Sequence, residues 1–348
     1  MEFDDVSRRT AKAINDIVQE YEYEPIPTHL QVGSLADVGY LKGKFLCHDN
    51  ATCINEVDAA DAEIVTGFGP TNAPTAGTLS VILKALALQR YSQLTTSVII
   101  SDLGAWNSRN MAWPELERLT GRYIEFLTAL GFNQDMGMLR SHRDHRNLEV
   151  SAWIARLIDD ADFEEHREAT DALYDLMNLR GPRFGIKIDI LFTIADILNP
   201  VLSGKRRVLV LAGIEEHYFT RLSRIVAARI AKSSLCSFIA SDTAIGGLYA
   251  RLVGGLPPFP KMSKSIPESG ISVAESIHDI RRKILDTQPE AQPVILQMVE
   301  LVSDWSPADV AQARAAFENR TVEPADWMGV KESYLEYFLR VARIWQRL

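Results

Sequence analysis

The sequence predicts an α/β fold, in which a parallel sheet forms a nucleotide-binding catalytic domain and an all-helical domain follows. Three observations lead to this prediction. Short, unbroken apolar runs, typical of buried parallel strands, alternate with helical patterns in the first part of the chain. A glycine-rich turn at residues 67–78 separates one such run from the next helix. Beyond residue 265 the pattern is helical only.

The predicted elements follow in a regular order. A helix at residues 6–23, a proline-rich link and a further helical stretch precede the first strand, at 63–67. Helix 78–94 and strand 97–101 complete a parallel unit. Pro114 in the first turn and Gly131 at the end mark the helix 114–130. The remaining predictions are a strand at 208–211 and helices at 218–232, 273–285, 291–302, 307–318 and 331–348.

This order divides the chain into three predicted domains. Residues 1–60 form a helical N-terminal extension, 61–265 a Rossmann-like catalytic domain, and 266–348 a helical C-terminal domain. With 348 residues and 47% apolar content, the chain is long enough to bury a core for a catalytic domain and a smaller one.

Charge and cysteine content restrict the class of protein. The formal net charge is −9, opposite to the usual charge of a nucleic-acid binder, although local basic patches are compatible with it. The odd cysteine count and the absence of a signal-peptide pattern predict a cytoplasmic protein with free thiols at Cys47, Cys53 and Cys236. Cys47, His48 and Cys53 could offer three metal ligands, but their spacing fits no common zinc pattern and a fourth is missing, so we expect no metal site. No apolar run approaches membrane-spanning length.

Two segments have the chemistry of an ATP site. Glycines in the turn at residues 67–78 let the backbone approach a phosphate, and the following helix begins with free N–H groups. Far downstream, Lys261-Met262-Ser263-Lys264-Ser265 follows a glycine- and proline-rich stretch suited to closing over a polyphosphate. A solvated lysine loop is the plain alternative for the second segment. The two segments occurring in this order favour a nucleotide.

The same residues resemble motifs of the class I aminoacyl-tRNA synthetases. Residues 261–265 match the KMSKS loop letter for letter, and the HIGH positions fall on residues 75–78. Residues 101–105 are similar to the ADLHA element and residues 213–216 to the G-x-[DE]-Q element. The resemblance extends over about residues 64–284. Order and spacing are those of the tyrosyl/tryptophanyl subclass, and are most similar to the archaeal and eukaryotic type of tyrosyl enzyme.

The resemblance implies an enzyme that activates an amino acid with ATP and Mg²⁺, by in-line attack on the α-phosphorus with pyrophosphate leaving. The residues implied in catalysis are Thr75, Thr78, Lys261 and Lys264. The implied ATP site contains Gly67, Gly69, Thr75, Gly77, Thr78, Gly213, Glu215, Lys261, Met262, Ser263 and Lys264. Thr78 replaces the usual His or Asn, and the loss of one oriented donor costs roughly 3 kcal/mol of transition-state stabilisation.

The implied amino-acid pocket departs from the tyrosyl pattern. The helix written Y-x-x-x-Q-x-x-D corresponds to residues 189–196, where Asp189, Thr193 and Asp196 share one face. Val65 replaces the tyrosine partner of the phenol. With Glu216 in place of Gln, and Asp102 nearby, the pocket is predicted to be acidic, which favours tryptophan or a diamino or other non-proteinogenic acid over tyrosine. Alternatively, Asp189 reaches solvent or pairs with Lys187 or Arg183.

Three functions remain open at this point. The first is a tRNA-charging enzyme, expected to be a homodimer, that uses basic segments 140–146, 205–207, 281–283 and the last helix, with Trp305, Trp327 and Trp345 either stacking on bases or lying in the core. The second is an ATP-dependent ligase that passes the acyl group to a small-molecule amine or carrier. The third is a non-catalytic regulator that binds nucleotide or RNA. Intact Lys261 and Lys264 argue against the third.

Overall fold

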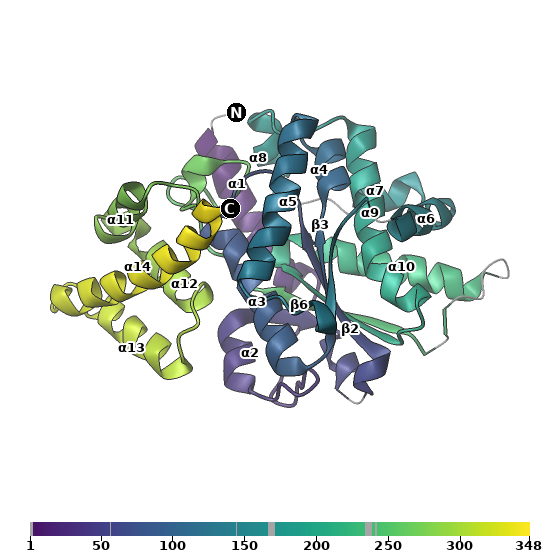
Figure 1. Cartoon of the computed structure of the whole chain (residues 1–348), viewed down its shortest axis with the longest axis horizontal. Helices are drawn as coiled ribbons and strands as arrows, with labels where there is room; N and C mark the ends of the chain where they lie inside the picture. Colours follow the sequence, from purple (N-terminus) through teal and green to yellow (C-terminus); the bar gives the residue numbers. More distant parts are fainter. Residues whose placement is uncertain (1–2, 56, 144, 166–170, 234–238, 241) are drawn as a thin grey trace.

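The computed structural model describes residues 3–55, 57–143, 145–165, 171–233, 239–240 and 242–348 (Figure 1). Within these residues one sheet has the strand order β1-β6-β5-β2-β3-β4. All neighbouring strands are parallel except β1, which pairs antiparallel with β6. The strands are β1 (Phe45–Asp49), β2 (Ala62–Phe68), β3 (Thr95–Ile100), β4 (Gly137–Ser141), β5 (Arg207–Gly213) and β6 (Ala244–Ala250). The predicted α/β class with C-terminal helices is confirmed.

Helices cover both faces of the sheet. On one face α3 and α5 share a hydrophobic core with the C-terminal helices; on the other, α9 and α10 pack with part of α1 in a second core. The longer helices are α1 (Phe3–Glu20), α3 (Ala76–Ser92), α5 (Trp113–Ala129), α6 (His145–Ile154), α9 (Arg183–Leu202), α10 (His217–Lys232), α11 (Ile277–Leu285), α12 (Gln292–Leu301), α13 (Pro307–Glu318) and α14 (Pro324–Arg347). The shorter ones are α2 (Val38–Lys44), α4 (Asp102–Ser108), α7 (Asp160–Glu165) and α8 (Asp171–Leu176).

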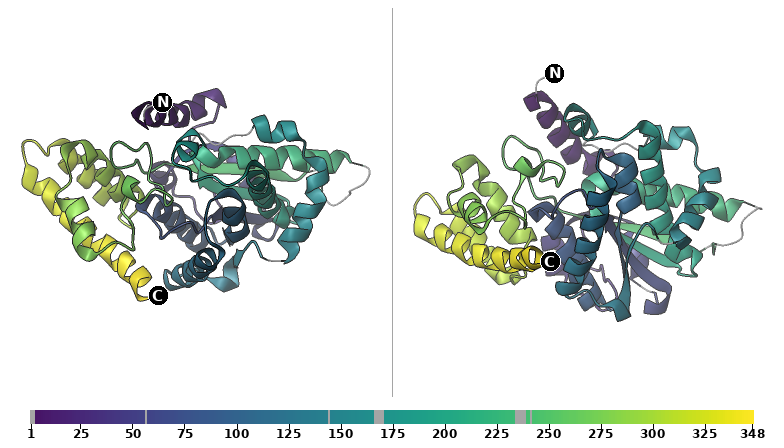
Figure 2. Two further views of the ribbon diagram at one scale, coloured as in Figure 1. Left: turned by 90° about the horizontal axis from the view of Figure 1, so that it is seen from above. Right: turned by 45° about the horizontal axis from the view of Figure 1, so that its top comes forward.

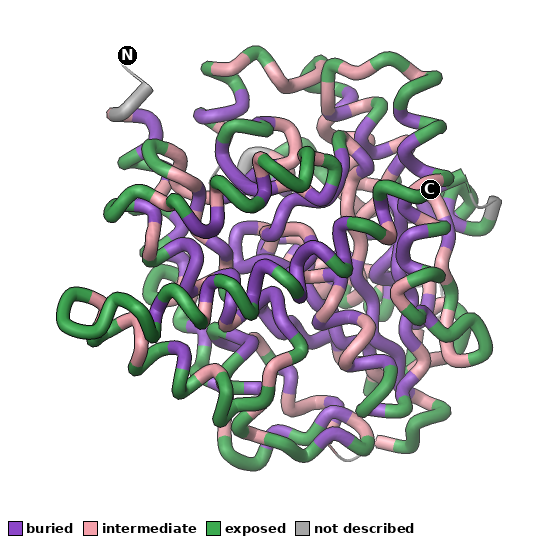
Figure 3. Tube along the Cα trace, turned by 60° about the vertical axis from the view of Figure 1, so that its left-hand side comes forward, coloured by how far each residue is buried: buried purple, intermediate pink, exposed green. Residues whose placement is uncertain are grey.

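The C-terminal helices form a group beside the sheet, as Figure 2 shows in green and yellow. One of their contacts with the α/β part is made by α14, whose Trp345 ring packs edge-on against Tyr123 and Phe126 of α5. Helices α12 and α13 also contact α2. Buried positions recur along the inner sides of the helices, while their outer sides are exposed (Figure 3). The three-domain division itself remains a prediction.

The expectation of a purely helical segment before residue 63 is wrong at β1. Phe45 and Cys47 are buried and Leu46 is exposed, so the alternation of a strand is present, but it lasts only a few residues beside helix α2. Its partner β6 was not predicted because two glycines weaken its strand pattern. Gly246 is nevertheless needed there, since a Cβ would lie 2.5 Å from the carbonyl oxygen of Asn50.

Candidate functional site

A cavity of about 1160 Å³ lies at the carboxyl ends of β2, β3 and β5. This is the edge at which open parallel sheets bind ligands. The start of α3, one side of α9 and the loop of residues 261–265 complete its walls. The two segments that the sequence assigned to an ATP site therefore face one cavity.

The glycine turn and the KMSKS-like loop are joined by direct contacts. The Ser265 hydroxyl donates to Thr71 Oγ1 at 3.2 Å. A Cβ on Gly77 would lie 3.2 Å from Cβ of Met262, so the loop packs directly against the first turn of α3. Just beyond the loop, the backbone N–H of Ala76 donates to the Ile271 carbonyl oxygen at 2.9 Å. The loop is held close to the helix N-terminus, where a phosphate would be stabilised.

The two lysines of this loop are held differently. Lys261 Nζ forms an ion pair with Glu215 Oε1 at 2.7 Å, which connects the loop to the segment after β5. Lys264 Nζ lies 5.2 Å from the ring centre of Phe68 and 5.8 Å from that of Tyr123. Burial lowers the pKa of Lys264 to about 7; Glu216 opposes this shift and Lys261 adds to it. A neighbouring anion would therefore favour the charged form of Lys264, which burial disfavours.

Most residues of the predicted ATP site line the cavity. They are Gly67, Gly69, Gly77, Thr78, Gly213, Glu215, Lys261, Met262, Ser263 and Lys264. Thr75 is not among the lining residues: it is buried at the N-cap of α3, and its hydroxyl has no hydrogen-bond partner among the described residues. The structure therefore places Thr78, and not Thr75, on the cavity wall.

The predicted amino-acid pocket is the part of the cavity beside α9. Val65, Asp189, Thr193, Asp196 and Glu216 line it. Apolar walls are added by Ile99, Ile190, Ile197 and Val210. The Thr193 hydroxyl donates back to the carbonyl oxygen of Asp189 at 3.1 Å.

Asp102 does not line this pocket. Its Oδ1 accepts hydrogen bonds from the backbone N–H groups of Leu103 and His142, at 2.9 and 3.0 Å. Its Oδ2 pairs with Arg143 Nε at 2.8 Å. The expected contribution of Asp102 to substrate binding is corrected accordingly: the carboxylate joins the start of α4 to the chain after β4.

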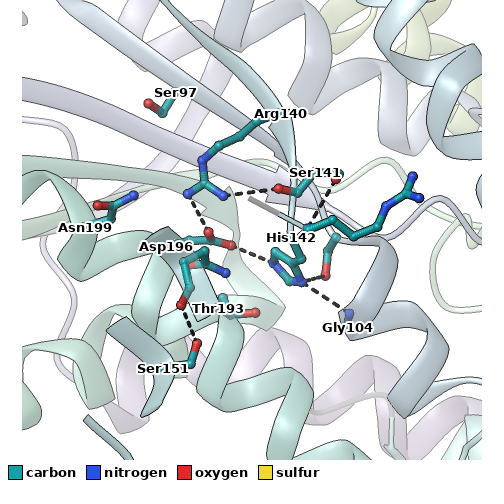
Figure 4. Close-up of polar contacts among 12 residues, drawn as sticks. Ser97, Gly104, Arg140, Ser141, His142, Ser151, Thr193, Asp196 and Asn199 are labelled. Carbon is teal, nitrogen blue, oxygen red and sulfur yellow. Dashed lines mark hydrogen bonds and ion pairs between the residues drawn. The ribbon is translucent and has the colours of Figure 1, made fainter. Parts of the chain in front are cut away.

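Asp196 is charge-compensated inside the protein (Figure 4). Its two oxygens pair separately, Oδ1 with Arg140 Nη2 at 2.7 Å and Oδ2 with His142 Nε2 at 2.6 Å. Burial opposes the charged imidazole, but the carboxylates of Asp196, Asp189 and Asp102 outweigh it and raise the pKa of His142. The expectation of a strongly acidic pocket is wrong at this position, because a buried carboxylate requires such partners and here receives them from the chain itself.

Sequence reasoning missed Arg140, His142 and Ser101 as site residues. The segment 140–146 was interpreted as a basic surface, and its proximity to Asp196 depends on β4, a strand with little apolar signal. Arg140 and His142 are buried, whereas Arg143 is exposed and pairs with Glu117 as well as Asp102. Asp144 of this segment lies outside the described residues.

Other predicted nucleic-acid contacts are also engaged within the protein. Arg206 pairs with Asp61 and Asp242, and Lys283 pairs with Glu275. Trp327 and Trp345 are buried, so the core alternative is correct for both.

Cys47 and His48 are neighbours on β1, and among the described residues no group of three His, Cys, Asp or Glu side chains is arranged to hold a metal ion. Cys47 and Cys53 are free thiols, while Cys236 lies outside the described residues. Within the described part of the chain, no helix is long and apolar enough to cross a membrane.

Comparison with known proteins identifies the fold. No family model matches the chain. Tryptophan–tRNA ligase 1 of Halobacterium salinarum is 25% identical over 171 residues, which are 47% of this chain and 30% of that protein. The chain thus matches less than a third of the length of this curated relative.

Solved structures match over nearly the whole chain. Tryptophanyl-tRNA synthetase from Encephalitozoon cuniculi bound to tryptophan has a TM-score of 0.70 and 16% identity, covering 96% of this chain and 94% of that one. The tryptophanyl-tRNA synthetase from Aeropyrum pernix has a TM-score of 0.66 and 19% identity, and the match covers 96% of both chains. A tryptophanyl-tRNA synthetase homolog from Entamoeba histolytica has a TM-score of 0.71 and 14% identity, and the match covers 96% of this chain and 92% of that one.

The chain therefore has the fold of the class I tyrosyl/tryptophanyl-tRNA synthetases. The relatives named above are tryptophanyl-tRNA synthetases or a homolog of them, whereas the sequence analysis expected the greatest similarity to tyrosyl enzymes.

Proposed function

We propose that this protein activates an amino acid with ATP, forming an aminoacyl-adenylate and pyrophosphate, and transfers the aminoacyl group to tRNA. The observation that carries the proposal is the single cavity in which the glycine turn, residues 213–216 and the KMSKS-like loop meet. This arrangement suits phosphoryl chemistry, because donors and cations surround the position of a triphosphate.

Each of these segments would have its own role in the reaction. Lys261 and Lys264 would follow the β- and γ-phosphates as charge develops on them, with Lys261 leaving Glu215. Thr78 and the backbone around Gly77 would bind from the side of α3. Mg²⁺ bound together with ATP would neutralise part of the charge of the phosphates. Protein nucleophiles are not required, since holding the carboxylate near the α-phosphorus supplies much of the acceleration.

Tryptophan is the proposed amino acid. The pocket beside α9 has apolar walls, its Asp196 is already paired, and the small Val65 leaves room where a tyrosine would stand. Tyrosine would lack the hydroxyl partner that a tyrosyl site provides, and the pairing of Asp196 removes one of the carboxylates that would favour a diamino acid. The tryptophan-bound relative agrees with this choice.

A ligase with a different acceptor is the second candidate. It is favoured by the net charge of −9 and by the ion pairs that occupy Arg143, Arg206 and Lys283. Phosphate backbones are bound chiefly through cations, so engaged side chains weaken the case for tRNA. A homodimer and a cytoplasmic location remain predictions for either candidate.

The test is amino-acid-dependent ATP–pyrophosphate exchange over a panel of amino acids, followed by transfer of the labelled amino acid to total tRNA or to small amines. Exchange that is highest with tryptophan and is followed by labelling of tRNA is the expected result. Exchange without tRNA labelling would select the second candidate. If no amino acid supports exchange, the proposed activity is wrong.

A further inference from the structure

Three polar side chains form a connected chain of hydrogen bonds at the wall of the amino-acid pocket. Ser101 follows β3 directly, His142 follows β4, and Asp196 lies on α9; all three line the cavity. His142 Nε2 lies 2.6 Å from Asp196 Oδ2, and His142 Nδ1 lies 3.3 Å from the Ser101 hydroxyl oxygen. Figure 4 draws the contact between His142 and Asp196 and that between His142 and Gly104.

The backbone around Gly104 fixes the direction of these hydrogen bonds. The N–H of Gly104 donates to His142 Nδ1 at 3.2 Å. Nδ1 is therefore an acceptor, and Nε2 carries the proton that is donated to Asp196. The Ser101 hydroxyl must then also donate to Nδ1, which leaves its oxygen lone pairs available to the cavity.

Gly104 is necessary for this arrangement. A Cβ at position 104 would lie 2.2 Å from the Ser101 hydroxyl oxygen and 2.1 Å from Asp189 Oδ1. The ADLHA element that the sequence resembles has a histidine at this position. Here the imidazole comes instead from His142, on a different segment, and the glycine leaves room for it.

Asp196, Arg140, His142 and Thr193 already have hydrogen-bond partners within the chain. Both oxygens of Asp196 have partners, Arg140 Nη2 and His142 Nε2 point at Asp196, and the Thr193 hydroxyl donates to backbone. The walls at Ile99, Ile190 and Ile197 are apolar. A side chain entering this pocket meets apolar surface, the Ser101 oxygen as an acceptor and the carboxylate of Asp189 beside it.

We propose that Ser101, positioned by His142 and Asp196, determines substrate specificity by accepting a hydrogen bond from a neutral N–H donor on a flat aromatic side chain, as in indole. A phenol is a poorer match, because its oxygen also accepts a hydrogen bond. The nearby N–H groups of Arg140 Nη2 and His142 Nε2 already donate to Asp196. An indole N–H needs only an acceptor. The inference rests on the proposed amino-acid activation and names the group that selects the amino acid.

The experiment compares tryptophan with L-3-(benzothiophen-3-yl)alanine, an analogue of nearly the same shape in which sulfur replaces the N–H. Exchange kinetics and calorimetric binding are measured for both ligands with the wild-type protein, Ser101→Ala and Ser101→Cys. Wild type should prefer tryptophan by about tenfold, the effect of one hydrogen bond. Ser101→Ala should reduce the ratio to about one, mainly through KM, and Ser101→Cys should lie between them because sulfur is a weak acceptor.

Ser151→Ala is the matched control. Its hydroxyl is buried and donates to the Asn147 carbonyl oxygen at 2.8 Å, outside the cavity lining, so the ratio should remain that of wild type. An unchanged ratio in Ser101→Ala, or a wild type that prefers the analogue, would overturn the inference. Exchange that is greatest with an amino acid lacking an aromatic N–H would overturn it too, while leaving amino-acid activation intact.

His142 is tested separately as a positioning residue. The carboxylates of Asp196 and Asp189 on α9 and of Asp102 on α4 act electrostatically on its ring, and Arg140 of β4 pairs with the same Asp196. When His142 takes up a proton at low pH, Nδ1 becomes a donor to Ser101, whose own proton then turns toward the substrate. The preference for tryptophan should therefore fall with decreasing pH in wild type. In His142→Asn the ratio should be lower and independent of pH; a wild-type pH profile in this variant would contradict the assignment.

Discussion

The charge state of Lys264, in the KMSKS-like loop, depends on its surroundings. Burial lowers the pKa of Lys264 to about 7, and a neighbouring triphosphate would raise that pKa again. Between the two pKa values the bound form holds more protons than the free form, so binding takes up a proton and weakens as pH rises above about 7. We predict an uptake approaching one proton when the nonhydrolysable analogue AMPPNP binds at pH 8.

Calorimetry in buffers of different ionisation enthalpy measures this uptake. Lys264→Arg is the control, because an arginine stays protonated and should bind without the proton uptake. Equal uptake in both proteins would assign the proton to another group. The same lysine is predicted to contribute about 2–4 kcal/mol to lowering the barrier of adenylation, seen as loss of exchange rate in Lys264→Ala.

A substitution at Thr78 is expected to raise the rate of adenylation. It lines the cavity at the first turn of α3, where the resembling enzymes carry His or Asn. A threonine hydroxyl supplies one donor but no positive charge, so we predict that Thr78→His raises the rate of adenylation by up to about a hundredfold, while the affinity for ATP remains similar. Single-turnover adenylate formation separates the two quantities. A slower chemical step in Thr78→His would show that the threonine is adapted to its own substrate.

At the scale of elements, contact between α3 and the KMSKS-like loop should control activity. A Cβ at Gly77 would lie 3.2 Å from Met262 Cβ and 3.4 Å from the Met262 carbonyl oxygen, so Gly77→Ala has to push the loop outward by a few tenths of an ångström. We predict a loss of kcat of roughly tenfold or more, because catalytic groups tolerate little displacement.

Gly121→Ala is the paired control for this substitution. Gly121 lies inside helix α5, and a Cβ there would have nothing within 4 Å. This variant should keep full activity and gain about 0.5–1 kcal/mol in the free energy of unfolding, since glycine is unfavourable within a helix. Full activity in Gly77→Ala would mean that the loop moves freely relative to α3.

Elements differed in how well the sequence predicted them. The central strands β2, β3 and β5 have continuous apolar runs because helices cover both faces, and each was predicted. The strands β1 and β4 at the sheet edges and the glycine-containing β6 lack that signal, and none of them was predicted. Helix α14 begins at Pro324, seven residues before its predicted start, in a polar first turn.

The residues of the candidate site also differ in how well the sequence predicted them. Motif residues on the central strands and on α3 were placed on the cavity, since strand, turn and helix are local in sequence. The partners of Asp196 were not, because Arg140 and His142 reach it only when β4 joins the sheet, more than fifty residues away along the chain. A buried carboxylate predicts that a partner exists but gives no indication of which distant cation supplies it.

At the scale of the whole molecule, the C-terminal helices and the α/β part share one hydrophobic core. Trp345 is fully buried, its ring lies 5.2 Å from that of Tyr123 and 5.3 Å from that of Phe126, and the Arg122 guanidinium stacks over it at 4.6 Å. Because Tyr123 also donates to the carbonyl oxygen of Asn72 in the glycine turn, packing of the last helix reaches the candidate ATP site through one side chain.

We therefore predict that Trp345→Ala lowers the free energy of unfolding by about 3–5 kcal/mol, the usual cost of removing a buried aromatic side chain. The loss should appear in a single transition followed by both tryptophan fluorescence and far-ultraviolet circular dichroism, because one core cannot melt in two parts. Adenylation should also weaken in the folded variant as Tyr123 loses its support. Val322→Ala, at a position that is 80% exposed, is the control and should change neither quantity measurably. Two separate transitions in Trp345→Ala, with the first leaving exchange activity intact, would show that the C-terminal helices fold independently of the catalytic part.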